Sequence, residues 1–411
     1  MLTSRGITLL TAAVFAWIAG RTLGIAELYA VSVAVAATVG LGLLYVRLAT
    51  TSVSARRLVD QQRVIAGARV QAVLELRNDA RLPSPTLLIT ETLPETFRAD
   101  GHPSPGRARF VLGGLGPGRL ASAPYGAVAA TRGRYEIGPM QVRLRDPFGT
   151  AERTRRFTAT SDLLVYPRVD HLPATPVRGS HMGSGSSASR RVFATGDEFY
   201  TMREYVRGDD LRHVHWPSTA HRQTLMVRQM EQPWQPHATV YLDSRSVAHT
   251  SGPQGTLEQA VSAAATFVYH LADAGYQLRL VTDGTAGRIG AIGWQHAMDR
   301  LAVLQPSGHS GLGPSLAATR GGEGLFVSAL GVPSGRGDLR SHPDMRALYG
   351  VKGYGQRLAV VVAEPGDARA AQAVALLRAS GWKAAVHHPG QPLEPAWVQL
   401  TRAGGRQVAG V

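Results

Sequence analysis

The hydrophobic and polar positions of this chain follow three patterns in succession, and the first is a pair of long apolar runs. Residues 28–46 carry no charge and come close to the roughly 20 residues that a helix needs to cross a bilayer. A shorter apolar run, residues 7–20, precedes them and ends at Arg21. Because few residues separate the runs and no convincing cleavage site precedes the second, the pattern predicts a retained helical hairpin over residues 6–25 and 27–47 rather than a signal peptide.

The charges around these runs predict the orientation of the hairpin. Several arginines follow the second run, beginning with Arg47, whereas the turn between the runs holds Arg21 and Glu27. Positively charged flanks of membrane helices stay in the cytoplasm. The expected localisation is therefore the cell membrane, with two helices and with both the N-terminus and the C-terminus in the cytoplasm. A hairpin buried in the core of a soluble protein is the alternative, and the lack of a polar face along so long a run argues against it.

The second pattern is an alternation of apolar and polar residues that begins near residue 50. Between Arg69 and Arg77 apolar side chains occupy every second position, which predicts a strand with one buried face. Further short runs lie between Pro, Gly and Asp turn signals, at residues 86–90, 107–112, 125–130, 140–144 and 163–166. Several short strands joined by turns predict a β-sandwich. The strings RGRYEIGP (132–139) and DPFG (146–149) are interpreted as two tight reversals at one edge of that sandwich.

The third pattern, from residue 237 onward, alternates strands with helices. Strands are expected at HATVYLD, YQLRLVTD, GLFVSAL, RLAVVVA and WKAAVHH, with helices near residues 257–272, 294–304, 344 and 367–380 between them. This alternation predicts an α/β domain with a parallel sheet. The expected fold class is thus α/β plus all-β. Its parts are a transmembrane helical hairpin (1–48), a β-sandwich (49–177), a loop with a charged junction (178–235) and the parallel-sheet domain (236–411). Within the junction, the Gly- and Ser-rich residues 178–189 are expected to form a flexible loop.

Composition removes several classes of chemistry. The chain of 411 residues has no cysteine, so disulfides, thiolate metal sites and cysteine nucleophiles are excluded. Lys352 and Lys383 are the only lysines and neither precedes Ser or Thr, so the chain has no Walker A loop. The formal net charge of +15 comes from arginines interspersed with acidic residues. Nucleic-acid or anionic-lipid binding is kept only as an alternative, because no basic cluster is interleaved with aromatic residues.

One segment is dense in charged, aromatic and histidine side chains where a connecting loop would be plain. It is residues 196–231, GDEFYTMREYVRGDDLRHVHWPSTAHRQTLMVRQME. The string resembles the signature of the bacterial domain-of-unknown-function 58 family. The matching residues are Glu198, Phe199, Arg203, Glu204, Tyr205, Gly208, Asp209, Arg212, His215, Trp216 and the stretch 225–228 that ends in Arg228. The departures from the signature are Thr201, Met202, Arg207, Pro217 and Ala220–His221.

The resemblance implies an architecture and a partner. The apolar hairpin and the strings RGRYEIGP, DPFG and VYPR are also similar to the family pattern, so the likeness extends over most of the chain. It implies a fold like the von Willebrand factor A domain for the C-terminal part. Family members are frequent companions of MoxR-type AAA+ ATPases, which makes such an ATPase, with other membrane proteins, the expected partner.

The charges of the signature segment support a structural interpretation. Arg203 and Arg212 carry forked guanidinium groups that suit bidentate pairing with carboxylates. The carboxylates within reach along the chain are Glu198, Glu204, Asp209 and Asp210. Such pairs would hold a loop at a domain junction. As an alternative, His213 and His215 would share one face of an extended stretch and could ligate a metal together with His221.

A second candidate metal site follows from the resemblance. Asp243 and Asp283 are expected at the carboxyl ends of parallel strands, where open α/β sheets bind ligands. Domains of the von Willebrand A type often hold a divalent ion through Asp-x-Ser-x-Ser, but here the string is Asp243-Ser244-Arg245-Ser246-Val247. Asp243, Ser244 and Ser246 are therefore candidate ligands of a cation such as magnesium. Because Arg245 competes for the same carboxylate, the site is expected to be degenerate.

Together these observations predict a membrane-anchored, non-catalytic interaction or adaptor protein at the cytosolic face. It is expected to work with a MoxR-type AAA+ ATPase in protein assembly or maturation, without a cofactor or a small-molecule substrate. The first alternative is a metal-dependent enzyme that uses Asp243, Asp283 or the cluster His213–His221. The second alternative is a protein that binds nucleic acid or anionic lipid.

Overall fold

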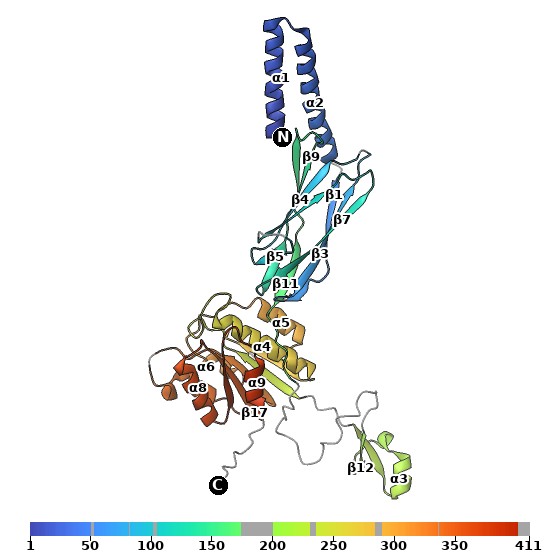
Figure 1. Cartoon of the computed structure of the whole chain (residues 1–411). Helices are drawn as coiled ribbons and strands as arrows, with labels where there is room; N and C mark the ends of the chain where they lie inside the picture. The colour runs from blue at the N-terminus through green and yellow to red at the C-terminus, as the bar shows by residue number, and fades with distance from the viewer. Residues whose placement is uncertain are drawn as a thin grey trace, which may run out of the picture. The chain divides into compact units, whose positions relative to one another are not determined.

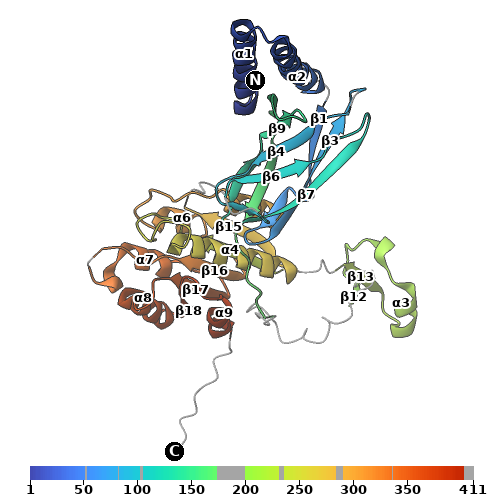
Figure 2. The same cartoon turned by 45° about the horizontal axis from the view of Figure 1, so that its top comes forward.

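The chain is organised as two compact units. The computed structural model describes residues 1–50, 53–81, 83–101, 105–173, 200–230, 236–283, 290–335 and 337–401 (Figures 1 and 2). Unit 1 comprises Met1–Arg168 and Met298–Leu304, and unit 2 comprises Val169–Ala297 and Gln305–Val411. The Gly- and Ser-rich stretch 178–189 lies outside the described residues.

Unit 1 begins with the expected hairpin of two apolar helices, α1 (Ser4–Leu23) and α2 (Ala26–Thr50). Thr3 caps α1 through a bond from the Gly6 N–H, and Gly24 ends it in the left-handed conformation with φ 71°. The Ser32 hydroxyl donates to the Ala13 carbonyl of the other helix at 2.7 Å. The predicted pair of helices is confirmed, and both are long and apolar enough to cross a membrane. That they span one stays a prediction, as does their orientation in it.

Three sheets follow in unit 1. The first contains β1 (Val53–Val59), β3 (Arg69–Asn78), β7 (Leu120–Ala129) and β5 (Phe97–Ala99), antiparallel in that order. The second contains β10 (Glu152–Phe157), β9 (Met140–Arg145), β4 (Thr86–Thr92) and β6 (Arg107–Leu112), also antiparallel. The third is β2 (Arg63–Ile65), β11 (Ser161–Tyr166) and β8 (Gly133–Ile137), in which β11 pairs parallel with β2 and antiparallel with β8.

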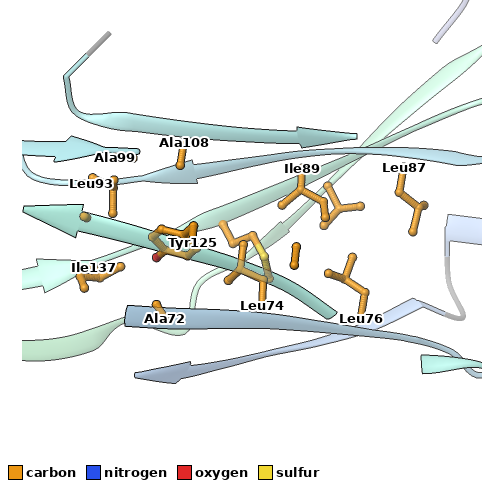
Figure 3. Close-up of a cluster of buried hydrophobic side chains, with 14 of the residues drawn as sticks. Ala72, Leu74, Leu76, Leu87, Ile89, Leu93, Ala99, Ala108, Tyr125 and Ile137 are labelled. Carbon is orange, nitrogen blue, oxygen red and sulfur yellow. The ribbon is translucent and has the colours of Figure 1, made fainter. Parts of the chain in front are cut away.

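The core of these sheets is built by the alternation that the sequence displays. Leu74 and Leu76 of β3 and Leu87 and Ile89 of β4 are fully buried, and they point into one shared layer in Figure 3. Alternate positions of β3 are more exposed, as expected when successive side chains point to opposite faces of a sheet. All six strands predicted in this region are present.

One predicted reversal is wrong, and one is confirmed. The string at residues 132–139 is not a tight turn, because Gly133–Ile137 forms β8 and pairs with β11. The turn signals Gly133 and Pro139 mark the ends of this short strand, while its interior alternates in exposure. By contrast, residues 146–149 form a turn between β9 and β10.

Unit 2 contains the predicted parallel sheet. Its strands are β15 (Gln277–Thr282), β14 (His237–Leu242), β16 (Leu325–Leu330), β17 (Gln356–Val362) and β18 (Lys383–His387), in that order and all parallel. Since β15 and β16 lie on opposite sides of β14, the winding direction reverses between β14 and β16. Crevices for ligands form at such reversals, at the carboxyl ends of the strands.

Helices cover both faces of this sheet (Figure 2). One face carries α4 (Thr256–Asp273) and α9 (Glu394–Thr401), whose Phe267 and Trp397 rings lie 5.6 Å apart. The other face carries α6 (Gly313–Ala317), η3 (Leu339–Ser341), α7 (Pro343–Tyr349) and α8 (Ala368–Ala379), which share one buried cluster with Tyr241 and Phe326. A further helix, α5 (Trp294–Ala302), lies where the sequence predicts one.

The described part of the signature segment, residues 200–230, forms a small structure that we call the signature hairpin. Its strands β12 (Tyr200–Glu204) and β13 (Met226–Met230) pair antiparallel. Between them lie a single 3₁₀ turn, η2 (Leu211–His213), and the short helix α3 (Trp216–Arg222).

Candidate functional site

The first candidate site is the turn that follows β12 in the signature hairpin. Arg203 binds Asp209 through both arms of its fork, with Nη1 to Oδ2 at 2.7 Å and Nη2 to Oδ1 at 2.6 Å. Asp209 Oδ2 also accepts from the Val206 N–H at 2.9 Å. Gly208 permits the turn, since its φ is 113°. Hydrogen bonds from Arg203 and from the Val206 amide hold the pKa of Asp209 below its usual value.

The other charged residues of the signature make local caps. Asp210 accepts from the Arg212 N–H and begins η2, and the Arg212 side chain is exposed. His215 Nδ1 accepts from the Ser218 N–H at 3.2 Å and begins α3. Glu204 and Tyr205 belong to the paired backbone where the two strands lead into the connecting segment. Glu198, Phe199 and the side chain of Arg228 lie outside the described residues.

The expected histidine face is wrong. The segment is not extended, because His213 ends a 3₁₀ turn, His215 caps α3 and His221 lies in the last turn of that helix. A helical turn rotates successive side chains away from one another. Among the residues that the structure describes, no group of three or more histidine or carboxylate side chains could hold a metal ion.

The signature hairpin exposes large apolar side chains. Trp216, Leu211 and Val206 are 68%, 62% and 61% exposed, while Val214, Met226 and Val227 fill its small interior. We call Val206, Leu211 and Trp216 the exposed trio. Trp216 was part of the sequence motif, but Val206 and Leu211 were not singled out. The signal that could have found them is an isolated apolar residue within a run of charges.

The second candidate site lies at the carboxyl end of β14. Arg245 is 1% exposed, and its Nε and Nη2 bind the two oxygens of Asp243, each at 2.8 Å. Its Nη1 binds Asp344 Oδ2 at 2.8 Å. Asp243 also accepts from the N–H groups of Arg245 and Gly331. Burial would raise the pKa of Asp243, but the bonds from Arg245 outweigh burial and lower it.

Asp283 has different partners at the end of β15. Its Oδ2 accepts from the Ser244 N–H at 2.6 Å and from the Ser244 hydroxyl at 3.1 Å. Its Oδ1 accepts from the Tyr241 and Ser315 hydroxyls, each at 3.0 Å. Burial and the nearby charge of Asp243 raise the pKa of Asp283. The pKa values of the two aspartates are thus shifted in opposite directions, because only Asp243 has a cation as its partner.

The candidate metal ligands are not assembled around one point. The Ser244 hydroxyl binds Asp283, Ser246 is exposed, and both oxygens of Asp243 are bound by Arg245. The guanidinium therefore occupies the place of a cation beside Asp243. Sequence reasoning missed Asp344, which reaches Arg245 from the first turn of α7. Only the topology of a parallel sheet could bring two such distant segments together.

A pocket of about 300 Å³ opens beside this cluster, lined by the segments that follow β14, β16 and β17. Its inner wall includes His249, whose Nε2 lies 2.9 Å from the Asp243 carbonyl and whose Nδ1 lies 3.2 Å from the Thr256 hydroxyl. A carbonyl only accepts, so Nε2 carries the proton and Nδ1 accepts from Thr256. Burial lowers the pKa of His249, which favours this neutral form.

Comparison with known proteins finds a family match over the signature hairpin and the first part of the second candidate site, including Asp243, Arg245 and Asp283. The family model described as "Protein of unknown function DUF58" matches residues 201–318. The family resemblance is confirmed. The uncharacterized protein YeaD of Bacillus subtilis (strain 168) is 25% identical to this chain over 181 residues, which is 44% of the chain and 45% of YeaD. The chain thus aligns with less than half of the length of this relative.

Two similar solved structures each cover 28% of the chain. A CARDB domain from Pyrococcus furiosus is 15% identical with a TM-score of 0.21, over 28% of this chain and 91% of that domain. A cohesin module of a family 33 glycoside hydrolase from Clostridium perfringens is 12% identical with a TM-score of 0.22, over 28% of this chain and 96% of that module.

Proposed function

We propose that this DUF58 protein is a membrane-anchored, non-catalytic interaction protein, and that the signature hairpin is its partner-binding surface. The observation that carries the proposal is the exposed trio. Val206, Leu211 and Trp216 are each more than 60% exposed within a stretch rich in charged residues. Exposed large apolar side chains can mark interaction sites, and tryptophan is prominent among residues that dominate binding energy.

The ion pair next to the trio supplies rigidity. Arg203 and Asp209 close the turn that contains Val206, and Asp210 fixes the start of the 3₁₀ turn that contains Leu211. A surface that is ordered before binding loses less conformational entropy when it binds. We therefore assign Arg203 and Asp209 a positioning role and the exposed trio the contact with the partner.

We further propose that the partner is an AAA+ ATPase of the MoxR type, acting in protein assembly or maturation at the cytosolic face. This part rests on the family resemblance and on the arginines that follow α2. The von Willebrand A-like interpretation of unit 2 belongs to the same proposal. Arg245 would serve there as a built-in cation that holds Asp243 and Asp344, so the sheet edge would be a platform that needs no metal.

The test is recovery of the ATPase with the full-length protein from native membranes. Tagged wild-type protein is expected to bring down an AAA+ ATPase, identified by mass spectrometry, and the double variant Leu211→Ala/Trp216→Ala is expected to lose it. Val111→Ala is the matched control, because Val111 is an equally exposed apolar residue (69%) in unit 1. Equal recovery with the double variant, or equal loss with the control, would reject the assignment of the surface.

Topology is tested separately. A reporter fused after residue 60 is expected to be active in the cytoplasm, since the arginines that follow α2 favour that side. Activity only on the outside would reject both the orientation and an ATPase partner.

A further inference from the structure

The loop Asp146–Gly149 lies against the beginning of the helical hairpin. The Thr3 hydroxyl donates to the Gly149 carbonyl at 2.6 Å, and the Thr3 N–H donates to the Thr150 carbonyl at 3.0 Å. Asp146 holds the loop from within, because it accepts from the Phe148 N–H at 3.2 Å and from the Ala151 N–H at 2.7 Å. The turn is therefore fixed to the residue that caps α1.

Glycines in both helices allow this close approach. A Cβ at Gly6 would overlap the Thr150 carbonyl, and a Cβ at Gly42 would lie 2.8 Å from Thr150 Oγ1 and 3.0 Å from Asp146 Oδ2. Beyond Gly42, the α2 residue Val46 is 2% exposed and belongs to the core of the sandwich. The loop thus marks the level at which α2 passes from an exposed helix into the folded domain.

The same level is the edge of the apolar surface of the hairpin. Ile7, Val14 and Phe15 of α1 are 56%, 58% and 67% exposed, as side chains that face lipid would be. The charged residues that flank this surface in α1 are Arg5 and Arg21. At 1.5 Å per residue they are about 24 Å apart along the helix, somewhat less than a typical hydrocarbon core. If the hairpin spans a membrane, Arg5 would lie at one of its boundaries.

An aromatic tip and two guanidinium groups meet at this boundary. Phe148 is 66% exposed at the end of the loop. A Cβ at the neighbouring Gly149 would lie 3.7 Å from Arg5 Nη1 and 3.9 Å from Arg145 Cδ, so both arginines flank the tip. The Arg145 side chain is 57% exposed. Its contact with Glu152 Oε2 at 3.3 Å uses one arm of the guanidinium.

We propose that Phe148, Arg5 and Arg145 form a lipid-headgroup anchor that binds the anionic surface of the bilayer. Aromatic rings and arginines are favoured at the membrane interface, where the ring lies among the headgroups and the guanidinium binds phosphate. The surface is continuous with the apolar helices, so the bilayer is the occupant that the hairpin itself brings into contact. The anchor would fix the height of the sandwich above the membrane. This inference rests on the membrane anchoring proposed above.

The absence of cysteine from the chain gives a direct test. A single cysteine, Phe148→Cys, is spin-labelled in the full-length protein in vesicles that contain phosphatidylglycerol, and its collisions with oxygen and with a water-soluble nickel chelate are measured. Thr96→Cys is the matched control, in an exposed turn at the far end of the sandwich. The ratio of oxygen to nickel collisions is expected to be several-fold higher at position 148 than at position 96.

Further samples distinguish failure of the headgroup anchor from failure of the membrane anchoring. A label at Phe15→Cys reports the hairpin, and an aqueous signal there would reject the membrane anchoring itself. If position 15 reports hydrocarbon while position 148 behaves like position 96, the headgroup anchor is rejected. Replacing phosphatidylglycerol with phosphatidylcholine, or introducing Arg5→Gln/Arg145→Gln, is expected to reduce the ratio at position 148. An aqueous signal at position 148 in vesicles, together with burial in native membranes, would assign the loop to a protein partner instead.

Discussion

Two arginine–aspartate pairs in this protein share one geometry and differ in their surroundings. Arg203 makes a bidentate hydrogen bond to Asp209, and Arg245 makes one to Asp243. The side chains of the first pair are 39% and 20% exposed, and those of the second are 1% and 0% exposed. The exposed pair closes a surface turn. The buried pair crosses the end of the parallel sheet and also ties in Asp344 from α7.

A third arginine–carboxylate pair, in unit 1, shows how the number of hydrogen bonds to a buried carboxylate affects its pKa. In unit 1, Arg57 binds only one oxygen of Glu91, with Nη2 to Oε1 at 2.6 Å. The other oxygen, Oε2, has no hydrogen-bond partner among the described residues. Burial therefore dominates and raises the pKa of Glu91 to about 7, in spite of Arg57. Asp243 is buried as deeply but both of its oxygens are bound, and its pKa is lowered. The number of satisfied oxygens decides which effect wins.

The largest effect is expected from removing the buried guanidinium. Arg245→Ala leaves Asp243 and Asp344 buried without their cation, and breaking such a pair costs about 3–5 kcal/mol. The free energy of unfolding of the full-length protein is measured by denaturant titration. Hydrogen exchange in β14 and β16 then assigns the loss to unit 2.

A rescue variant controls for simple loss of packing. Asp243→Asn/Arg245→Met removes the uncompensated charge of Asp243, so it is expected to be more stable than Arg245→Met alone. A cost for Arg245→Ala no greater than that for Arg203→Ala would contradict the role given to burial.

The next effect is a pH dependence in unit 1. The pKa of Glu91 rises from 4.5 to about 7 on folding, so the folded protein favours the protonated carboxyl. The contribution of this group to stability is greatest below pH 4.5, falls between pH 4.5 and about 7, and is constant above. The span is about 3 kcal/mol at most. Glu91→Gln is expected to flatten this decline, as measured by urea unfolding from pH 5 to 8 with hydrogen exchange in β3 and β4. An unchanged slope would show that Glu91 ionises normally.

A smaller effect is expected at the exposed pair. Arg203→Ala leaves Asp209 in contact with water, so the thermal midpoint is expected to change little. The Val206 amide, which donates to Asp209, is expected to exchange faster because its acceptor is no longer held in place. Recovery of the proposed AAA+ partner is expected to fall in parallel. A large drop in the midpoint with unchanged exchange at Val206 would instead make this pair a structural element of unit 2.

Periodic features of the fold could be predicted, because periodicity is a local property of the chain. The alternation around Leu74 and Leu76 identified a strand with one buried face, and the uncharged run identified α2. Turn signals were less decisive. Gly133 and Pro139 predict a reversal, but they mark the two ends of a strand whose partner, β11, lies further along the chain.

The candidate sites were predictable only in part, because their partners come from distant segments. The signature motif indicates that Arg203 needs a carboxylate, and the string Asp243–Val247 indicates that Arg245 can bind Asp243. Asp209 and Asp243 are close to these arginines in sequence. Asp344 reaches Arg245 only because β14 and β16 are neighbours in the sheet. Likewise, no local pattern distinguishes a tryptophan that fills a core from one that is exposed, as Trp216 is. Trp216 is exposed because the signature hairpin is too small to bury it.

The smallest effect is expected from added metal, and it tests whether the guanidinium has replaced a cation. Magnesium or manganese at about millimolar concentration is expected to leave the thermal midpoint unchanged, because a ligand stabilises a fold only well above its dissociation constant. Arg245 binds both oxygens of Asp243, so an ion would have to displace a buried group that makes two hydrogen bonds.

Arg245→Ser removes this competitor and leaves two buried carboxylates, Asp243 and Asp344, without a cation. The thermal midpoint of that variant is expected to rise slightly when metal is added. A further Asp243→Ala change should abolish this rise. Val247 supplies no hydroxyl, so only part of a site is formed. A clear rise in the unmodified protein would place a metal beside Arg245 and would reopen metal-dependent binding at the sheet edge.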